Sequence, residues 1–180
     1  GLPRATTVRC NDETGMRLLI EHLIESGHQR ISHISVETGA VAKSRSDAYK
    51  SVMTEKGLAK FIQIQMASAP TETAGSEAAT VLAASKIAPT AITTYNDLLA
   101  IGAQGATDSD VAIVGYDNTF LANLRQISLT SVDPANNEIA LKAAELLLNK
   151  SDEVTSKGKV FLLEPKLVIR NSSKSLLKVR

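Results

Sequence analysis

Two short apolar runs that each end abruptly in polar residues constrain the fold of this chain most. Residues 91–94 are small and β-branched and stop at Tyr95-Asn96-Asp97, and residues 111–114 are uninterruptedly apolar and stop at Gly115-Tyr116-Asp117-Asn118. Such runs are typical of parallel strands that are covered on both faces. Ligands bind at the C-terminal ends of such strands, because the loops diverge there and helix N-termini point into the crevice.

Strand-like and helical patterns alternate along most of the chain. Between the strands, apolar residues recur at helical spacing, as in Leu19 and Leu23, and a glycine such as Gly27 ends the helix. This alternation predicts an α/β fold with a parallel sheet and right-handed crossovers. Residues 37–46 are expected to be a loop with Arg45 near its end. The expected strands are 6–10, 31–36, 61–66, 91–94, 111–114, 129–132, 160–163 and 167–169, with a long helix opening at Asp133 and Pro134.

Composition excludes several classes of function. The 180 residues can bury one large core or two small lobes, and their formal net charge of +1 does not indicate a surface for polyanions. Three Phe, three Tyr and no Trp are few for stacking on the bases of a single strand. Cys10, the one cysteine, cannot form an internal disulfide, which favours the reducing cytoplasm. No apolar stretch approaches the ~20 residues that span a bilayer, so we expect no membrane partner.

Seven segments, each weak alone, resemble in sequence and order the effector-binding region of the LacI/GalR family of bacterial transcription regulators. They are HLIESGHQRISHI from residue 22, R-x-x-x-Y from Arg45, PTAITTYNDLLAIGA from residue 89, DVAIVGYDN from 110, SLTSVDP from 128, KAAELLLN from 142 and LVIRNS from 167. Together they cover nearly all of the chain. Three departures stand out: the helix-turn-helix and half of one lobe are absent, residues 104–109 are shorter than usual, and Ala48 replaces a usual glycine.

The resemblance implies a periplasmic-binding-protein-like fold of two Rossmann-like lobes that close on a small molecule by a hinge. Residues 1–28 and 128–156 would belong to the N-terminal lobe, 29–127 and 157–171 to the C-terminal lobe, and 172–180 would be a tail. Because the chain has no initiating Met and enters almost at once into a strand-like segment and a helix, we expect that it begins partway through a larger protein. The implied partners are a small-molecule effector, a second copy in a homodimer, and DNA through a helix-turn-helix domain outside this chain.

Arg45, Asn96 and Asp117 stand where the family carries ligand-contacting residues. A guanidinium and a carboxylate can bind vicinal hydroxyls of a sugar, one by donating and the other by accepting, while a carboxamide does both. Each residue also has a structural interpretation: Arg45 as a solvated side chain at a helix start, Asn96 as a helix cap and Asp117 as a turn residue.

Two weaker candidates complete the predicted ligand set. Asn11 stands where many relatives have Asp, but it can also simply cap a helix. Pro70 falls where some relatives place an aromatic ring, and a proline face can pack against a sugar. The three histidines and Cys10 lack metal-site spacing, and the sequence contains no catalytic elbow or phosphate loop, so we expect neither a cofactor nor an enzyme.

The sequence thus predicts the effector-binding and dimerisation core of a cytoplasmic transcription regulator that binds a small polar metabolite, foremost a sugar, between lobes. Two alternatives remain at this point. One is a periplasmic or secreted sugar-binding protein of the same fold, and the other is a small α/β enzyme that uses Asp117 or Asp97.

Overall fold

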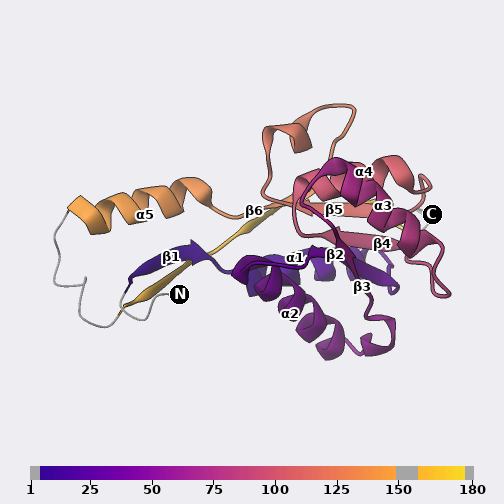
Figure 1. Cartoon of the computed structure of the whole chain (residues 1–180), viewed down its shortest axis with the longest axis horizontal. Helices are drawn as coiled ribbons and strands as arrows, with labels where there is room; N and C mark the ends of the chain where they lie inside the picture. The colour runs from indigo at the N-terminus through magenta and orange to yellow at the C-terminus, as the bar shows by residue number, and fades with distance from the viewer. Residues whose placement is uncertain (1–4, 149–157, 177–180) are drawn as a thin grey trace.

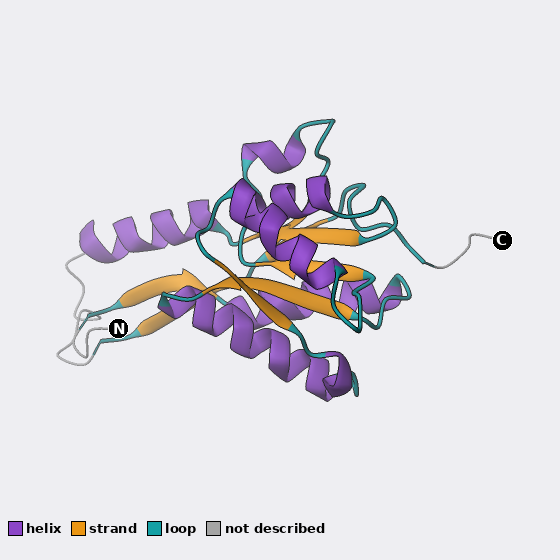
Figure 2. Cartoon of the chain, turned by 45° about the vertical axis from the view of Figure 1, so that its right-hand side comes forward, coloured by secondary structure: helices purple, strands orange, loops and turns teal. Residues whose placement is uncertain are grey.

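The computed structural model describes residues 5–148 and 158–176, which form a six-stranded sheet and a separate two-stranded sheet. Helices cover both faces of the six-stranded sheet, whereas the two-stranded sheet and one long helix project from its side (Figure 1). Figure 2 shows the same arrangement with the helices in layers on either side of the larger sheet. We call these parts the sheet lobe and the projecting unit.

The sheet lobe confirms the predicted parallel α/β architecture. Its strands follow the order β3-β2-β4-β5-β6-β8, and all neighbours are parallel except β8, which pairs antiparallel with β6. The central strands are buried along their whole length because helices cover both faces. The strands are β2 (Ile31–Val36), β3 (Ile64–Ala67), β4 (Ala91–Thr94), β5 (Ala112–Tyr116), β6 (Thr130–Asp133) and β8 (Lys166–Val168).

Two separate cores hold the helices to this sheet. On one face α1 (Asp12–Glu25) and α2 (Ala40–Glu55) bury large side chains, among them Leu19 and Tyr49. On the other face α3 (Glu72–Ala83) and α4 (Asp97–Ala106) bury mainly alanines. Gly102 lets α3 and α4 approach closely, because a Cβ there would lie 1.8 Å from the Glu72 carbonyl oxygen. Short 3₁₀ turns, η1 (Ala59–Phe61) and η2 (Phe120–Asn123), complete the lobe.

The projecting unit consists of β1 (Thr7–Cys10), which pairs parallel with β7 (Val160–Leu163), and α5 (Asn136–Leu148), which packs on β1. Little covers α5. Leu146 is its only buried residue in the described part of the helix, whereas Leu141, Leu147 and Leu148 are more than two-thirds exposed. Most of the apolar side chains of this helix are therefore left uncovered by the described residues.

The division into lobes differs from the one expected, which joined 1–28 to 128–156 and 29–127 to 157–171. Helix α1 belongs to the sheet lobe because Leu19 and Leu23 bury against that sheet. Strand β6 also belongs there, since it pairs with β5 and β8, while β7 pairs with β1 in the projecting unit. The expected tail from 172 is packed up to Leu176, because Ser172 pairs with Ile113 and Leu176 donates to Ser26.

The predicted ends of individual helices and strands are less accurate than the prediction that these elements exist. Arg45 lies within α2 rather than in a loop, because the helix begins at Ala40 directly after Gly39, whose φ is 112°. The strand expected at 61–66 begins at Ile64, since Phe61 belongs to η1. The expected helix beyond 148 and the loop after it lie outside the described residues. Within the described ranges, no helix is both long and apolar enough to cross a bilayer.

Candidate functional site

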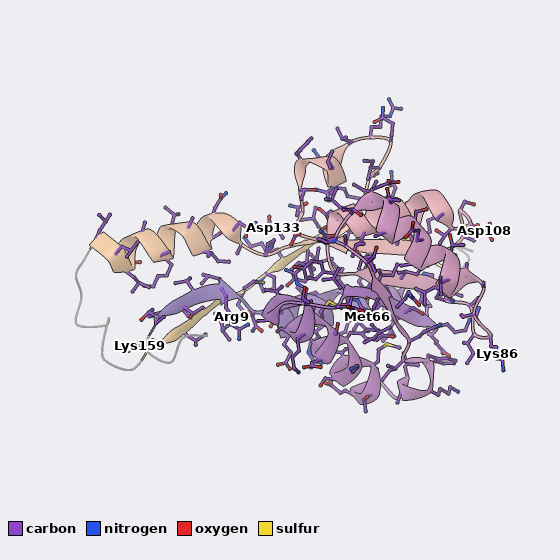
Figure 3. The ribbon with its side chains drawn as sticks, viewed as in Figure 1. Arg9, Met66, Lys86, Asp108, Asp133 and Lys159 are labelled. Carbon is purple, nitrogen blue, oxygen red and sulfur yellow. The ribbon has the colours of Figure 1, made fainter. Side chains whose placement is uncertain are left out.

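An open cleft of about 630 Å³ lies between the sheet lobe and the projecting unit. One wall comes from the N-terminal half of α2 and the loop after β5, at the C-terminal edge of the parallel strands. The other wall comes from β1, β7 and the start of α5. Asp133 lies at the junction where the chain leaves the sheet lobe toward α5 (Figure 3). The cleft is therefore lined by both parts of the molecule.

Arg45 is the central charged group of the cleft and is 6% exposed. Its Nε donates to Asp12 Oδ1 at 3.1 Å, and both terminal nitrogens lie 3.5 Å from Asp117 Oδ1. One terminal nitrogen also donates to the Tyr95 carbonyl oxygen at the end of β4. A buried guanidinium is thus held between two carboxylates and a strand end, in one fixed orientation.

Two aromatic rings support the guanidinium. The Arg45 Cζ atom lies 3.5 Å from the centroid of the Tyr116 ring and 5.2 Å from that of Tyr95, which are cation–π distances. Burial raises the pKa of Tyr116, whose hydroxyl lies 3.3 Å from Cys10 Sγ. Gly15 makes room for this ring, because a Cβ there would lie 2.2 Å from the Tyr116 hydroxyl oxygen. The Tyr116 ring therefore packs face-on against the Arg45 guanidinium.

Asp117 occupies a backbone conformation that few non-glycine residues adopt, with φ at 102°. Burial raises its pKa to about 6, although the nearby Arg45 guanidinium opposes that rise. Asp97 anchors the loop that contains Asp117. The Asp97 carboxylate accepts a hydrogen bond from the Thr119 amide at 2.7 Å and one from the Ser131 hydroxyl at 2.6 Å. Asp97 thus ties the loop after β5 to the start of β6.

The structure brings two of the five predicted ligand residues together, Arg45 and Asp117. Asn96 caps α4 by accepting from the Leu99 amide at 3.0 Å. Asn11 caps α1 and donates to Glu164 Oε1 at 3.1 Å, and Pro70 is an exposed loop residue after β3. These three are not among the described residues that line the cleft.

Sequence reasoning missed Asp12 and Tyr116. Asp12 is 4% exposed, lines the cleft and binds Arg45, whereas its position in the first turn of α1 indicated only a favourable helix-dipole charge. A signal was present, because Asp12 follows a strand end in the same way as Asp97 and Asp117 do. Nothing in the sequence indicated that the Tyr116 ring would lie under Arg45.

The chemistry of this arrangement is recognition of polar groups by fixed donors and acceptors. Arg45 and Asp117 present a guanidinium and a carboxylate side by side in a cleft whose lining also includes apolar surface from Val41, Ile139 and Val160. Among the described residues, no group of three or more His, Cys, Asp or Glu side chains is placed to hold a metal ion.

The sheet lobe has a parallel sheet covered on both faces, and its cleft lies at the C-terminal edge of that sheet. A second unit, joined to it by chain crossovers, faces the cleft. This arrangement is that of a periplasmic-binding-protein-like domain. The family of the periplasmic binding protein-like domain matches residues 20–173. A LacI transcriptional regulator from a Rhodococcus species is 28% identical, with a TM-score of 0.89 over 98% of this chain and 67% of that one. A LacI-family regulatory protein from Corynebacterium glutamicum is 31% identical, with a TM-score of 0.80 over 94% of this chain and 68% of that one.

A curated relative, the HTH-type transcriptional repressor PurR of Pasteurella multocida, is 30% identical over 91% of this chain and 51% of its own length. The chain belongs to the LacI/GalR family of transcription regulators, as part of their effector-binding region. It spans about half the length of the curated relatives that it matches. Those relatives are named as repressors and regulators of transcription, which are not enzymes.

Proposed function

We propose that this chain is the effector-binding core of a LacI-type regulator, and that it binds a small polar metabolite, foremost a sugar, in the cleft between its two parts. The observation that carries this proposal is the buried Arg45, held 3.5 Å from Asp117 in a cleft that both parts line. The pair can donate to and accept from neighbouring hydroxyls of one ligand. DNA would be contacted by a helix-turn-helix domain outside this chain.

Ligand binding would act through the connections between the sheet lobe and the projecting unit. The chain crosses between them at residues 10–12, 133–136 and 163–166. A ligand that touches both walls of the cleft would favour one relative position of the two parts over others. By linkage, the effector and DNA would then change each other's affinity by the same factor, and ~1–3 kcal/mol of coupling is typical.

We also propose that the complete protein is a cytoplasmic homodimer. Exposed apolar side chains on the sheet lobe support a contact with a second copy. Phe120 is 79% exposed, and Leu98 is exposed in the first turn of α4. The residues directly before these two, Thr119 and Asp97, are hydrogen bonded, so both apolar groups lie on neighbouring segments. Equilibrium sedimentation of the complete protein should give a mass of two chains, and a monomer at all concentrations would contradict the dimer.

The test of effector binding is calorimetry on the complete protein with sugars and nucleobases. A true ligand at about one hundred times its dissociation constant should add ~2.7 kcal/mol to the free energy of unfolding. Asp117→Asn should lose that binding, because asparagine tolerates a positive φ but cannot supply the carboxylate. The matched control is Asp110→Asn, an exposed aspartate before β5 that does not line the cleft.

The outcomes separate the alternatives. Binding that survives Asp117→Asn unchanged would place the ligand elsewhere. Turnover of a bound metabolite by the wild type would favour an α/β enzyme, and a secretion signal on the complete protein would favour a solute-binding protein without a role at DNA.

A further inference from the structure

The donors of Arg45 are largely used within the protein. A guanidinium has five N–H groups. In this structure one is directed at Asp12, one at the Tyr95 carbonyl, and one from each terminal nitrogen at Asp117. Arg45 is therefore a neutralised, fixed group in the wall of the cleft, with one N–H left for a ligand. It is a poor receptor for a phosphate, which needs several free donors.

The acceptors of the two carboxylates are less fully used. Asp12 Oδ2 has only a 3.9 Å ion pair with Arg9, and no hydrogen bond to Asp117 Oδ2 is present among the described residues. Asp117 is more exposed than its partner, with 36% of its side chain accessible. Two carboxylates share one buried guanidinium, so these three groups carry a net negative charge when both carboxylates are ionised.

We infer that the cleft selects ligands that donate hydrogen bonds, such as neutral polyols or amino sugars, and rejects phosphorylated or carboxylated ones, and that Asp12 sets this charge selection. This inference rests on the proposed effector-binding function and narrows its class of ligand. Hydroxyl and ammonium groups can donate to the open carboxylate oxygens. An anion placed beside Asp117 meets two like charges in a partly desolvated cleft, where their repulsion is stronger than in bulk water.

Arg9 is the cation that could oppose this selection. It lies on β1 at the cleft and is labelled in Figure 3, beside the junction of the two parts. Its side chain is 48% exposed, and its ion pair with Asp12 spans 3.9 Å. Solvent and salt screen such an exposed charge much more than the buried Asp12 carboxylate, so Arg9 contributes less to the selection than Asp12 does.

The experiment is calorimetry on the complete protein with matched compounds: glucose, glucosamine and glucose 6-phosphate, and ribose with ribose 5-phosphate. The pH is kept above the Asp117 pKa of about 6, so that this carboxylate is ionised. For a sugar that binds, the phosphorylated partner should bind at least about tenfold more weakly, and glucosamine at least as tightly as glucose. We call the ratio between the dissociation constants of a sugar phosphate and its sugar the gap. Asp12→Asn should narrow this gap, whereas Asp110→Asn should leave it unchanged.

The outcomes distinguish the two levels of the proposal. A sugar phosphate that binds as tightly as its sugar would overturn the charge selection and leave the proposed function standing. A gap that Asp12→Asn does not change would overturn the role of Asp12. If Asp12→Asn does not fold, the wild-type gap should still shrink as salt rises, because screening weakens the repulsion, and a gap independent of salt would overturn the inference. If none of the five compounds binds and the wider screen of sugars and nucleobases proposed above finds no ligand either, the proposed effector class itself is overturned.

Discussion

Helices α1 and α5 have similar apolar patterns but opposite surroundings. In α1, Leu19 is fully buried between α2 and the sheet, whereas in α5, Leu147 is 80% exposed. The reason is that the sheet lobe contains both the helix and the surface that receives it, while the described residues of the projecting unit supply only β1 and β7 next to α5. An apolar helical pattern therefore predicts that a face will be buried, but not whether its partner lies in the same stretch of chain.

The largest expected effect comes from shortening one leucine in each helix. Leu19→Ala should lower the free energy of unfolding by about 2–5 kcal/mol, because it leaves a cavity in a closed core. Leu147→Ala should change it by less than about 0.5 kcal/mol, because the side chain touches little. Urea denaturation of the 180-residue chain measures both. If both variants lose the same free energy of unfolding, Leu147 is packed in solution, which would contradict the contrast between α1 and α5.

The second largest effect tests how tightly the sheet lobe is closed. Gly102→Ala should destabilise by about 1–3 kcal/mol, because its Cβ would lie 1.8 Å from the Glu72 carbonyl oxygen and force α3 and α4 apart. Gly105 in the same helix is the matched control, since a Cβ there meets nothing within 4 Å. Gly105→Ala should therefore be neutral or stabilising by up to about 1 kcal/mol. A harmless Gly102→Ala would show that the two helices can separate freely.

The sequence predicted the sheet lobe well because its signals are local. Runs such as residues 91–94 and 111–114 are typical of buried strands, and α1 and α2 end shortly before Gly27 and Gly57. Strand pairing is not local, so the sequence could not show that β6 joins the six-stranded sheet while β7 pairs with β1. Residues 40–46 were expected to be a loop, although Ala40, Ala42 and Lys43 are good helix formers that extend α2.

The candidate site was predicted in part, for a similar reason. Asp117 was found because it follows a strand end, and Arg45 because its spacing from Tyr49 resembles the family. Asp12 follows a strand end too, but a carboxylate in the first turn of a helix has a sufficient local explanation. Its contact with Arg45 joins residues 33 positions apart, and the Tyr116 ring reaches Arg45 from another strand. Such contacts exist only after the sheet has formed.

The smallest effect over its measured range, between pH values of about 6.5 and 5, concerns acid sensitivity, which should arise in the sheet lobe. His33 in β2 is fully buried against Tyr49, and burial lowers its pKa from its ordinary value of 6.5 to about 3. The unfolded chain therefore binds a proton below pH ~6.5 that the folded chain refuses, so stability falls as the pH drops from about 6.5 toward 3. The expected loss is about 1.4 kcal/mol per pH unit well below 6.5.

His33→Gln isolates this effect, because glutamine is uncharged and can still bond to Thr93 Oγ1, which lies 3.0 Å from His33 Nδ1. The useful measurement is the slope of the unfolding free energy against pH between about 5 and 6.5, rather than the stability itself, which the substitution also lowers. His22→Gln is the comparison, because His22 is only partly buried and bonds to Ser173; burial lowers the pKa of His22 as well, so this substitution should change the slope in the same direction but less. If the slope is unchanged in His33→Gln, the acid sensitivity does not come from His33 in the core. If the slope changes more in His22→Gln than in His33→Gln, the partly buried His22 is its main source.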